Sequence, residues 1–354
     1  MTEIYSNLKI FKHPDKLEDL DEGYISGPIT ARIKPTNICD HRCYYCSTIV
    51  KPTYDEESIH YFDRTDSIEW PLLKRTINEL ADMGTMGVIF AGGGEPLVYP
   101  QINDAIDLCY RNDQEVGFIT NGWKLKGKTA RLLAKAKWVR VSFNSADANT
   151  FAQMRSTTLE CFNEIIDNMA QFAKIKKGRL GINYGITAEN STQVYDFCKL
   201  MKEIGVDNVK FSPIIFKEGS EEYHSKISAE CNMLIEKAKQ DFEDENFSVI
   251  NKYLESLQTS TIFHRNYTKC YIMQTVACIA ADSKVYYCHD RAYMRSSILG
   301  DLKKHTFKHI WFSDKTKKIF ETLDPSKICN QHCVWDSRNV AIQNYLNLED
   351  VNFI

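Results

Sequence analysis

Three cysteines in the first part of the chain have a spacing that suits a metal cluster: Cys39, Cys43 and Cys46, separated by three and then two residues. Three thiolates can bind three of the four iron atoms of a [4Fe–4S] cube, which leaves one iron open to a small molecule. An open iron beside a bound ligand is a reactive centre, whereas a fully ligated cluster mainly carries electrons. A structural zinc site is the alternative, but His41 lies too close to Cys39 and Cys43 to supply a separate fourth corner.

A glycine-rich segment follows a short apolar run: Gly92, Gly93 and Gly94 precede Glu95 and Pro96. Glycines let the backbone approach a ligand closely and expose its N–H and C=O groups. The carboxylate of Glu95 can hold an ammonium group. By itself such a turn is weak evidence, because many strands run into helices through glycine turns.

Taken together, the cysteine triplet and the glycine-rich segment resemble the radical S-adenosylmethionine (radical SAM) superfamily, over roughly residues 30–215. In that family the three cysteines hold a [4Fe–4S] cluster, the glycine-rich loop receives the methionine amine of SAM, and SAM binds the open iron. The resemblance implies the same roles for these residues here.

Polar residues at the ends of two later predicted strands resemble further SAM contacts of the family: Asn121, Ser142 and Asn144. Such residues reach the ribose or the carboxylate of SAM, although aspartate is common where Asn144 stands. Tyr45 is expected to pack beside the adenine, and Arg155 can pair with a carboxylate. For each of these residues the alternative is an ordinary strand-end cap or packing role.

Short β-branched or aromatic runs alternate with amphipathic helical patterns. Six strands are predicted, at residues 29–35, 87–91, 116–120, 138–143, 180–187 and 207–213, with helices at about 69–84, 101–112, 127–136, 158–175 and 191–204. This order implies a parallel sheet with right-handed crossovers. With the family resemblance it predicts an α/β fold, a partial (β/α)6 TIM-like barrel with ligands at the C-terminal ends of its strands.

A second group of cysteines follows in the last third of the chain: Cys270, Cys288, Cys329 and Cys333. Residues 277–288 have a β-hairpin pattern with a turn at 282–284. Four thiolates from this hairpin and a downstream loop can fully ligate a second [4Fe–4S] cluster, with a structural zinc as the alternative.

This arrangement resembles the Twitch form of the SPASM/Twitch C-terminal extension, which carries one auxiliary cluster. Ser283 stands where the family has a glycine, and the closing pair is C-x3-C in place of C-x2-C. Cys278 is either a hairpin core residue or an alternative ligand. The predicted segments are an N-terminal extension (1–28), the radical SAM partial barrel (29–224), a connector (225–265) with helical patterns through 225–258, and a small hairpin-containing iron–sulfur (Twitch-like) domain (266–354).

The resemblance implies an oxidoreductase of the dehydrogenase or epimerase type. An electron donor such as flavodoxin or ferredoxin reduces the first cluster, SAM is cleaved to a 5′-deoxyadenosyl radical, and the radical takes a hydrogen atom from the substrate. A dehydrogenase also needs a base for the hydroxyl or amine proton. Asp290, two residues after Cys288, is the catalytic candidate, with a polar turn residue as the alternative.

The expected substrate is a small molecule, such as a sugar, an aminocyclitol or a nucleotide-linked intermediate, which is oxidised or epimerised at carbon. About 28 residues precede the first predicted strand, too few for the leader-binding element that peptide-modifying relatives usually carry. A maturase of a ribosomally made peptide and a non-enzymatic iron–sulfur electron carrier are the alternatives.

Composition agrees with a cytoplasmic protein without nucleic-acid or membrane partners. The 354 residues carry a net charge of −3 with 26% charged residues, which gives no polybasic footprint for nucleic acid. No apolar run approaches the roughly 18 residues needed to span a bilayer. The N-terminus lacks a signal-peptide pattern, and several of the twelve cysteines cluster as in metal sites, so a reducing compartment is expected.

Overall fold

The fold is built on a single mixed sheet. The computed structural model describes residues 6–50, 62–216, 219–261, 265–329 and 333–349. These residues form a ten-stranded sheet with the order β10-β9-β8-β1-β2-β3-β4-β5-β6-β7. The strands are β1 (Thr30–Ile33), β2 (Gly87–Phe90), β3 (Glu115–Thr120), β4 (Trp138–Ser142), β5 (Arg179–Ile186), β6 (Asn208–Pro213), β7 (Ser248–Asn251), β8 (Val276–Ile279), β9 (Lys284–Tyr286) and β10 (Ile298–Asp301).

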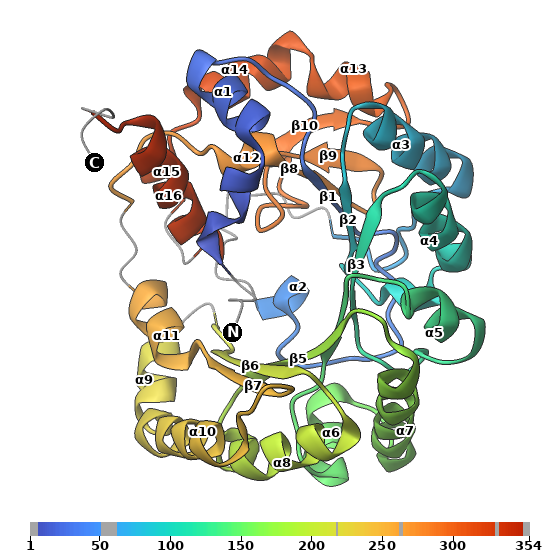
Figure 1. The fold of residues 1–354 in the computed structure, drawn as a ribbon, viewed down its shortest axis with the longest axis vertical. Coiled ribbons are helices and arrows are strands. Elements are labelled where there is room, and N and C mark those ends of the chain that lie inside the picture. Colours follow the sequence, from blue (N-terminus) through green and yellow to red (C-terminus); the bar gives the residue numbers. More distant parts are fainter. Residues whose placement is uncertain (1–5, 51–61, 217–218, 262–264, 330–332, 350–354) are drawn as a thin grey trace.

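The sheet curves around a central space without closing, as Figure 1 shows. From β8 through β1 to β7, every neighbouring pair of strands is parallel, whereas β8, β9 and β10 pair antiparallel. The six strands predicted from the sequence are β1 to β6. The prediction of an α/β fold with a partial barrel is therefore confirmed.

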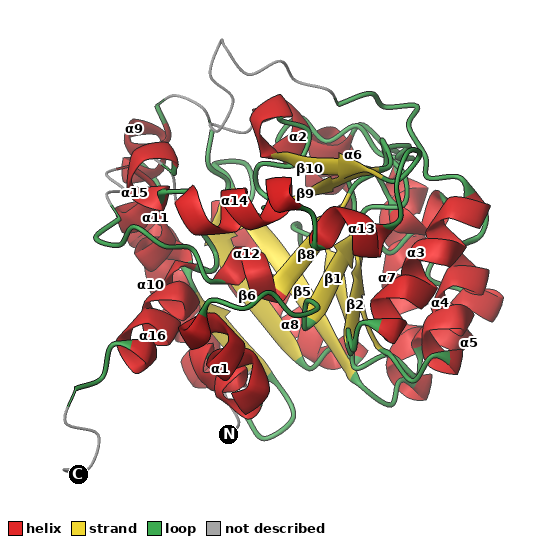
Figure 2. Ribbon diagram, turned by 90° about the horizontal axis from the view of Figure 1, so that it is seen from above, coloured by secondary structure: helices red, strands yellow, loops and turns green. Residues whose placement is uncertain are grey.

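Helices surround the sheet: most cover its outer face (Figure 2), but the short one after β1 lies over the central space (Figure 1). They are α1 (Pro14–Glu22), α2 (Ser47–Val50), α3 (Trp70–Asp82), α4 (Ile102–Arg111), α5 (Gly127–Leu133), α6 (Ala148–Arg155), α7 (Leu159–Ile175), α8 (Val194–Ile204), α9 (Ser220–Ser225), α10 (Ser228–Phe242), α11 (Tyr253–Thr261), α12 (Ile272–Thr275), α13 (Phe307–Trp311), α14 (Asp314–Thr322), α15 (Pro325–Ile328) and α16 (Asp336–Leu346), with 3-10 turns η1 (Asn7–Lys12), η2 (Pro96–Val98), η3 (Ser191–Gln193) and η4 (Arg295–Ser297).

Local sequence sets the ends of these helices. The Thr158 side chain accepts a hydrogen bond from the backbone N–H of Cys161 and so caps the start of α7. Gly205 ends α8 with a left-handed φ of 90°, which costs glycine little. The apolar faces of α3, α4, α7 and α8 then pack with the outward side chains of the strands into one large core.

The C-terminal region extends the same sheet. β8 lies parallel to β1, with Thr30 opposite Val276, although these residues are far apart in the chain. The predicted hairpin is formed by β8 and β9, and Ser283 turns it with a left-handed φ of 64°. A glycine adopts this conformation more easily, so the family's glycine at this position has a physical reason.

The region after β6 differs in one respect from the prediction of one or two helices over residues 225–258. After α9 and α10 the chain forms β7, which pairs with β6, and only then α11. Phe247 and Val249 are buried at 2% exposure, so this short run is held by the sheet edge. A strand of four residues is too short to show the alternation of apolar and polar residues that distinguishes a strand from a helix in a sequence. The predicted limits of the four segments stay a prediction.

Within the described ranges, no helix has both the length and the apolar character needed to cross a membrane.

Candidate active site

The three-cysteine loop and the glycine-rich loop lie side by side at the C-terminal ends of β1 and β2. Gly94 N–H donates to the carbonyl of Thr36 (3.0 Å), and Glu95 N–H donates to the carbonyl of Ile38 (2.9 Å). A side chain at Gly94 would place its Cβ 2.1 Å from the Ile38 oxygen. Gly94 is therefore required because its backbone lies against the backbone of Ile38, the residue before Cys39.

Glu95 has a buried carboxylate that already accepts several hydrogen bonds. Its Oε1 accepts from Leu97 N–H (2.9 Å) and the Thr120 hydroxyl (2.7 Å), and its Oε2 accepts from Asn121 N–H (2.6 Å). A carboxylate has about four acceptor positions, so Oε2 retains one for an ammonium group. Burial raises the pKa of Glu95 to about 7, and these hydrogen bonds oppose the rise.

Asn121 connects this carboxylate to the cysteine loop. Its side-chain amide donates to Asp40 Oδ1 (2.7 Å), and its backbone N–H is bound to Glu95. The other oxygen of Asp40 is buried and has no hydrogen-bond partner among the described residues. The predicted SAM residues Glu95 and Asn121 are thus brought into direct contact, with Asp40 as a member that the sequence patterns did not indicate.

A second group joins the ends of β4 and α6. Arg155 donates to the carbonyl of Ser142 (2.6 Å) and to Asn144 Oδ1 (3.0 Å). The Tyr45 hydroxyl also donates to Asn144 Oδ1 (3.0 Å). The structure thus brings Tyr45, Ser142 and Asn144 together and uses Arg155 to hold them. Helix α6 was not predicted, although it supplies this arginine.

His41 is buried between Arg155 and a cysteine of α7. Its Nδ1 lies 3.3 Å from Arg155 Nη1, and its Nε2 lies 3.5 Å from Cys161 Sγ. Burial, with the adjacent Arg155 charge, lowers the pKa of His41 to about 3, so the ring is neutral near pH 7. Because both ring nitrogens have these partners, the geometry disfavours His41 as the fourth ligand of a zinc site.

The three cysteines fit a cluster with one open iron. Cys46 N–H donates to the carbonyl of Cys43 (3.2 Å), which forms a tight turn between the second and third thiol. Burial raises the pKa of Cys39 to about 12, with Glu95, Asp40 and Cys43 adding to the rise. A thiol in this environment loses its proton only when a bound metal stabilises the thiolate.

The four C-terminal cysteines converge as predicted. All four line one cavity of about 60 Å³, together with Tyr287, Pro325 and Trp335. Burial raises the pKa of every one of these thiols, to about 11 at Cys270, to about 12 at Cys333, and in the same direction at Cys288 and Cys329. Four thiols that line one cavity suit a fully ligated cluster.

Cys278 is not among the residues that line this cavity. It is 1% exposed and packs with Ala280, Tyr286 and Tyr293 in a small apolar cluster. The sequence left Cys278 as either a core residue of the hairpin or an alternative cluster ligand. Its burial in this cluster supports the core role.

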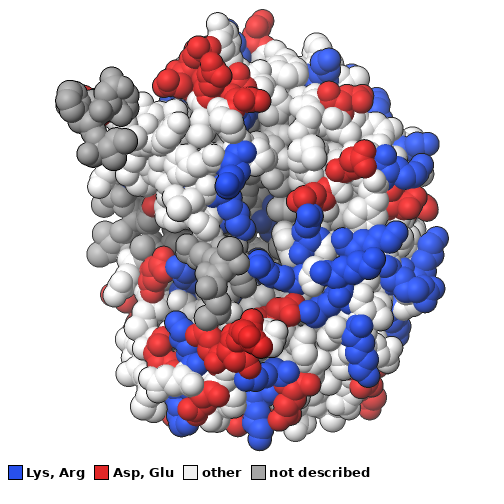
Figure 3. Space-filling model, viewed as in Figure 1, with Lys and Arg blue, Asp and Glu red and all other residues white. Residues whose placement is uncertain are grey.

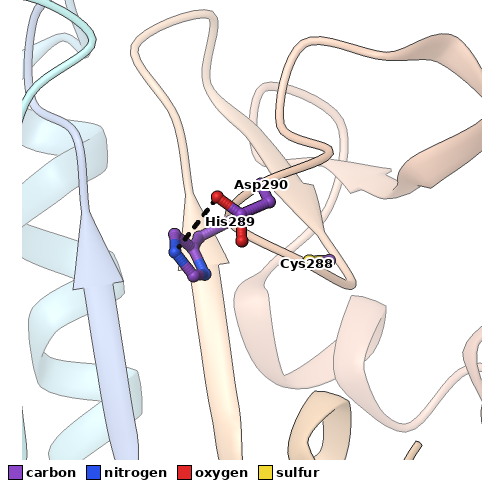
Figure 4. A group of neighbouring side chains, drawn as sticks. All are labelled: Cys288, His289 and Asp290. Carbon is purple, nitrogen blue, oxygen red and sulfur yellow. Dashed lines mark ion pairs between the residues drawn. The ribbon is translucent and has the colours of Figure 1, made fainter. Parts of the chain in front are cut away.

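Asp290 lies beside Cys288 and His289 (Figure 4), and each of the three offers a ligand atom within 4.8 Å of the others. Its Oδ1 is 3.4 Å from His289 Nε2, and its side chain is 23% exposed. The negative charge of Asp290 raises the pKa of Cys288 and Cys333 and attracts Arg32 on β1. Asp290 is thus close to one of the C-terminal cysteines, and its charge also acts on β1.

A contact from the C-terminal region supports the glycine-rich loop. The Tyr293 hydroxyl donates to Asn37 Oδ1, and the Asn37 amide donates to the carbonyl of Asp63 (2.7 Å). A Cβ at Gly93 would lie 2.0 Å from Asn37 Oδ1. No local signal marks Tyr293 or Asn37, because their contact depends on the pairing of β8 with β1.

Comparisons with known proteins agree with this geometry. A family model described as the radical SAM superfamily matches residues 33–225, and one described as an iron–sulfur cluster-binding domain (SPASM) matches residues 270–334. A probable GTP 3′,8-cyclase of Sulfurisphaera tokodaii is 24% identical over 221 residues, which cover 58% of this chain and 64% of that protein. A tungsten-containing aldehyde ferredoxin oxidoreductase cofactor-modifying protein of Pyrococcus furiosus is 22% identical over 189 residues, 51% of this chain and 50% of that one. The chain thus spans less than two thirds of the length of these relatives.

Solved structures show the same fold. SuiB of Streptococcus suis, bound to precursor peptide SuiA, superposes with a TM-score of 0.63 at 16% identity, covering 87% of this chain and 70% of SuiB. The protein anSMEcpe with bound AdoMet superposes with a TM-score of 0.61 at 18% identity, covering 88% of each chain.

Proposed function

Since the chain belongs to the radical SAM superfamily, we propose that it takes a hydrogen atom from a small-molecule substrate held inside the barrel and so oxidises or epimerises it. Its cofactors are a [4Fe–4S] cluster with SAM, and its SPASM domain indicates an auxiliary iron–sulfur site. Cys39, Cys43 and Cys46 are the proposed ligands of the first cluster. The proposed ligands of the auxiliary cluster are Cys270, Cys288, Cys329 and Cys333.

When bound and reduced, the first cluster supplies a 5′-deoxyadenosyl radical from SAM, which removes a hydrogen atom from a C–H bond. The residues of this chain position SAM. Gly93 and Gly94 expose the backbone to its amino group, and Glu95 Oε2 offers the remaining acceptor position. Asn144, held by Tyr45 and Arg155, presents an amide at the end of β4.

The position of Asp290 is the observation that carries the oxidative proposal. Its carboxylate lies within 4.8 Å of the Cys288 thiol, and its charge acts on Arg32 of β1. Once a hydrogen atom has left the substrate carbon, Asp290 accepts the hydroxyl or amine proton. The four cysteines would hold a cluster able to take up the remaining electron, which would complete a two-electron oxidation.

A peptide substrate is the second candidate. It is favoured by the likeness to SuiB, whose structure contains a precursor peptide. Because that likeness rests on 16% identity, it concerns the fold of the two proteins. The electron-carrier alternative is less favoured, since the glycine-rich loop and Glu95 would then have no ligand to hold.

Deuterium transfer tests the proposal. Reconstituted, reduced protein is incubated with SAM and with deuterated candidates from two panels, sugars with aminocyclitols and nucleotide-linked sugars, and synthetic peptides. We expect deuterium in 5′-deoxyadenosine only with a member of the small-molecule panel. Deuterium transfer from a peptide alone would contradict the proposed substrate class and support the maturase.

A further inference from the structure

Basic side chains line the inside of the barrel on three separate strands: Arg32 on β1, Arg140 on β4 and Lys210 on β6. Each lies between two apolar neighbours that are at most 1% exposed and belong to the core between the sheet and the outer helices. Side chains alternate between the two faces of a strand. The three basic side chains therefore point away from the helices and into the barrel.

These charges are close enough to repel one another. Burial lowers the pKa of Lys210 to about 8, and Arg140 is the largest of the like charges that add to this shift. Lys252 and Arg338 of α16 repel Lys210 as well, and Glu255 opposes them. Burial also lowers the pKa of Arg338, again with repulsion from Arg140. Arg32, Arg140 and Lys210 thus lie on the inner face of the sheet, and Arg338 of α16 lies at the N-terminal ends of the strands.

Arg32 provides an observation that does not depend on charge. Its Nε is buried and makes no hydrogen bond to any described residue. A buried donor without an acceptor costs free energy, so native proteins usually supply a partner for it. Asp290 and Cys278 attract the Arg32 charge, while Arg140 repels it. The Nε donor thus remains available to an oxygen atom of a ligand.

A cavity lies at the N-terminal ends of the strands, and of the four basic residues Arg338 is the one that lines it. Trp138 and Arg338 line a cavity of about 350 Å³ together with the first residues of β1, β2 and β3. The Arg140 guanidinium lies over the Trp138 ring at 5.2 Å, and Gly117 makes space for that ring, because a Cβ there would come within 2.3 Å of it. Figure 3 shows basic side chains around the hollow at the centre of this face.

From this arrangement we infer that Arg32, Arg140, Lys210 and Arg338 bind an anionic group of the substrate, with phosphate or carboxylate oxygens. Arginine and lysine together recognise such oxygens through charge-assisted hydrogen bonds. Several cations favour a multiply charged group. The inference rests on the proposed function, because it names the substrate class of that same barrel.

The geometry of β4 indicates how far the anionic group lies from the SAM-binding edge. Arg140 precedes Ser142, at the end of β4, by two residues, which corresponds to about 7 Å along a strand. The anionic group therefore lies deeper in the barrel than the SAM-binding edge. The substrate must extend from the basic groups to that edge, where its reacting carbon meets the radical.

Ligand binding to the reconstituted protein tests the inference, with inorganic phosphate and malonate as separate probes. We expect at least one of them to bind by isothermal titration calorimetry and to raise the melting temperature. Lys210→Met and Arg140→Gln are each expected to weaken that binding by about ten-fold or more. Arg140→Lys should recover part of the affinity, because it restores the charge.

Lys199, an exposed residue of α8, provides the matched control. Lys199→Met removes one lysine charge outside the barrel and should leave the affinity unchanged. The melting temperature of each ligand-free variant shows whether it is folded, so that a loss of affinity can be assigned to the site. Phosphate binding alone would indicate a phosphorylated substrate, and malonate binding alone a carboxylate; either supports the inference.

Two results would overturn the anion site: no binding of either probe to wild type, or an equal loss of affinity with Lys199→Met. The proposed function is judged separately by 5′-deoxyadenosine formation from SAM in the absence of both probes. A protein that cleaves SAM but binds neither anion keeps its radical chemistry and loses only this substrate class.

Discussion

The chain builds its two cysteine sites in different ways. The first site lies within one loop after β1, where three thiols are separated by only a few residues. The second site collects four thiols from three segments: the start of α12, the end of the β9 hairpin and the residues after α15. One site is therefore specified by local sequence, and the other depends on the completed fold.

The surroundings of the two cysteine sites also differ: the first lies beside a loop suited to bind a ligand, and the second is enclosed by side chains. Around the first site the backbones of two loops approach each other through glycines, and Glu95 keeps an acceptor position for a ligand. The second site is enclosed by Tyr287, Pro325 and Trp335. Three ligands beside a binding loop suit chemistry on a bound molecule, whereas four ligands in an apolar shell suit electron transfer. The predictions below test this division of labour.

The largest expected effect comes from removing an auxiliary thiol. Cys288→Ala should lower the iron content after anaerobic reconstitution from about eight to about four atoms per chain. SAM cleavage should remain measurable, because the first site is intact, while product formation is lost. Iron analysis and 5′-deoxyadenosine quantification provide the measurements. Cys278→Ala is the matched control, because Cys278 lies outside the cavity, and it should keep all its iron.

Replacing the proposed base should separate the two half-reactions. We expect Asp290→Asn to lower product formation by about 100-fold or more, since asparagine cannot accept the substrate proton. SAM cleavage should persist, because Asp290 lies beside Cys288 and His289 of the C-terminal region and the three cysteines of the first site are unchanged. Full product formation by this variant would exclude Asp290 from the mechanism.

The pH dependence of SAM binding tests Glu95. Burial raises its pKa to about 7, and only the ionised carboxylate attracts an ammonium group. SAM affinity should therefore rise with pH, by about ten-fold between pH 6 and pH 8, as the carboxylate loses its proton. Glu95→Gln should bind SAM weakly and without this pH dependence. A wild-type affinity that is flat across this range would remove Glu95 as the amine contact.

The smallest effect is expected at the contact between the two regions. Tyr293→Phe removes the hydrogen bond to Asn37 and should lower the free energy of unfolding by about 1 kcal/mol. SAM affinity should fall by a few-fold, because Asn37 supports the loop at Gly93. Chemical denaturation and SAM titration measure the two effects. A variant with unchanged SAM affinity would show that the C-terminal region does not influence the binding loop.

The strands of the barrel could be predicted because each is a short apolar run between polar helices. The pairing of β8 with β1 could not, since nothing in a local segment indicates which edge a strand joins. For the same reason the contact of Tyr293 with Asn37 was missed. Helix α6 is hard to predict because it ends only a few residues before α7 begins. The sequence does not show that Arg155 binds Ser142 and Asn144, because these contacts depend on the folded chain.

The site residues show the same limit. Local patterns identified the cysteines, the three glycines and Glu95, and the structure places them together. The inward basic residues had a usable signal, the alternation Val139-Arg140-Val141 and Val209-Lys210-Phe211. A charged residue on one face of a buried parallel strand must point into the barrel. Only the curved sheet shows that Arg32, Arg140 and Lys210 share one interior.

The central claim is that the three-cysteine site performs radical chemistry and the four-cysteine site does not. It is tested most directly by 5′-deoxyadenosine formation from SAM in wild type, Cys43→Ala and Cys288→Ala, each reconstituted and chemically reduced. We predict formation by wild type and by Cys288→Ala, and none by Cys43→Ala. Formation by Cys43→Ala, or no formation by wild type whose first cluster is intact and reduced, would contradict the claim.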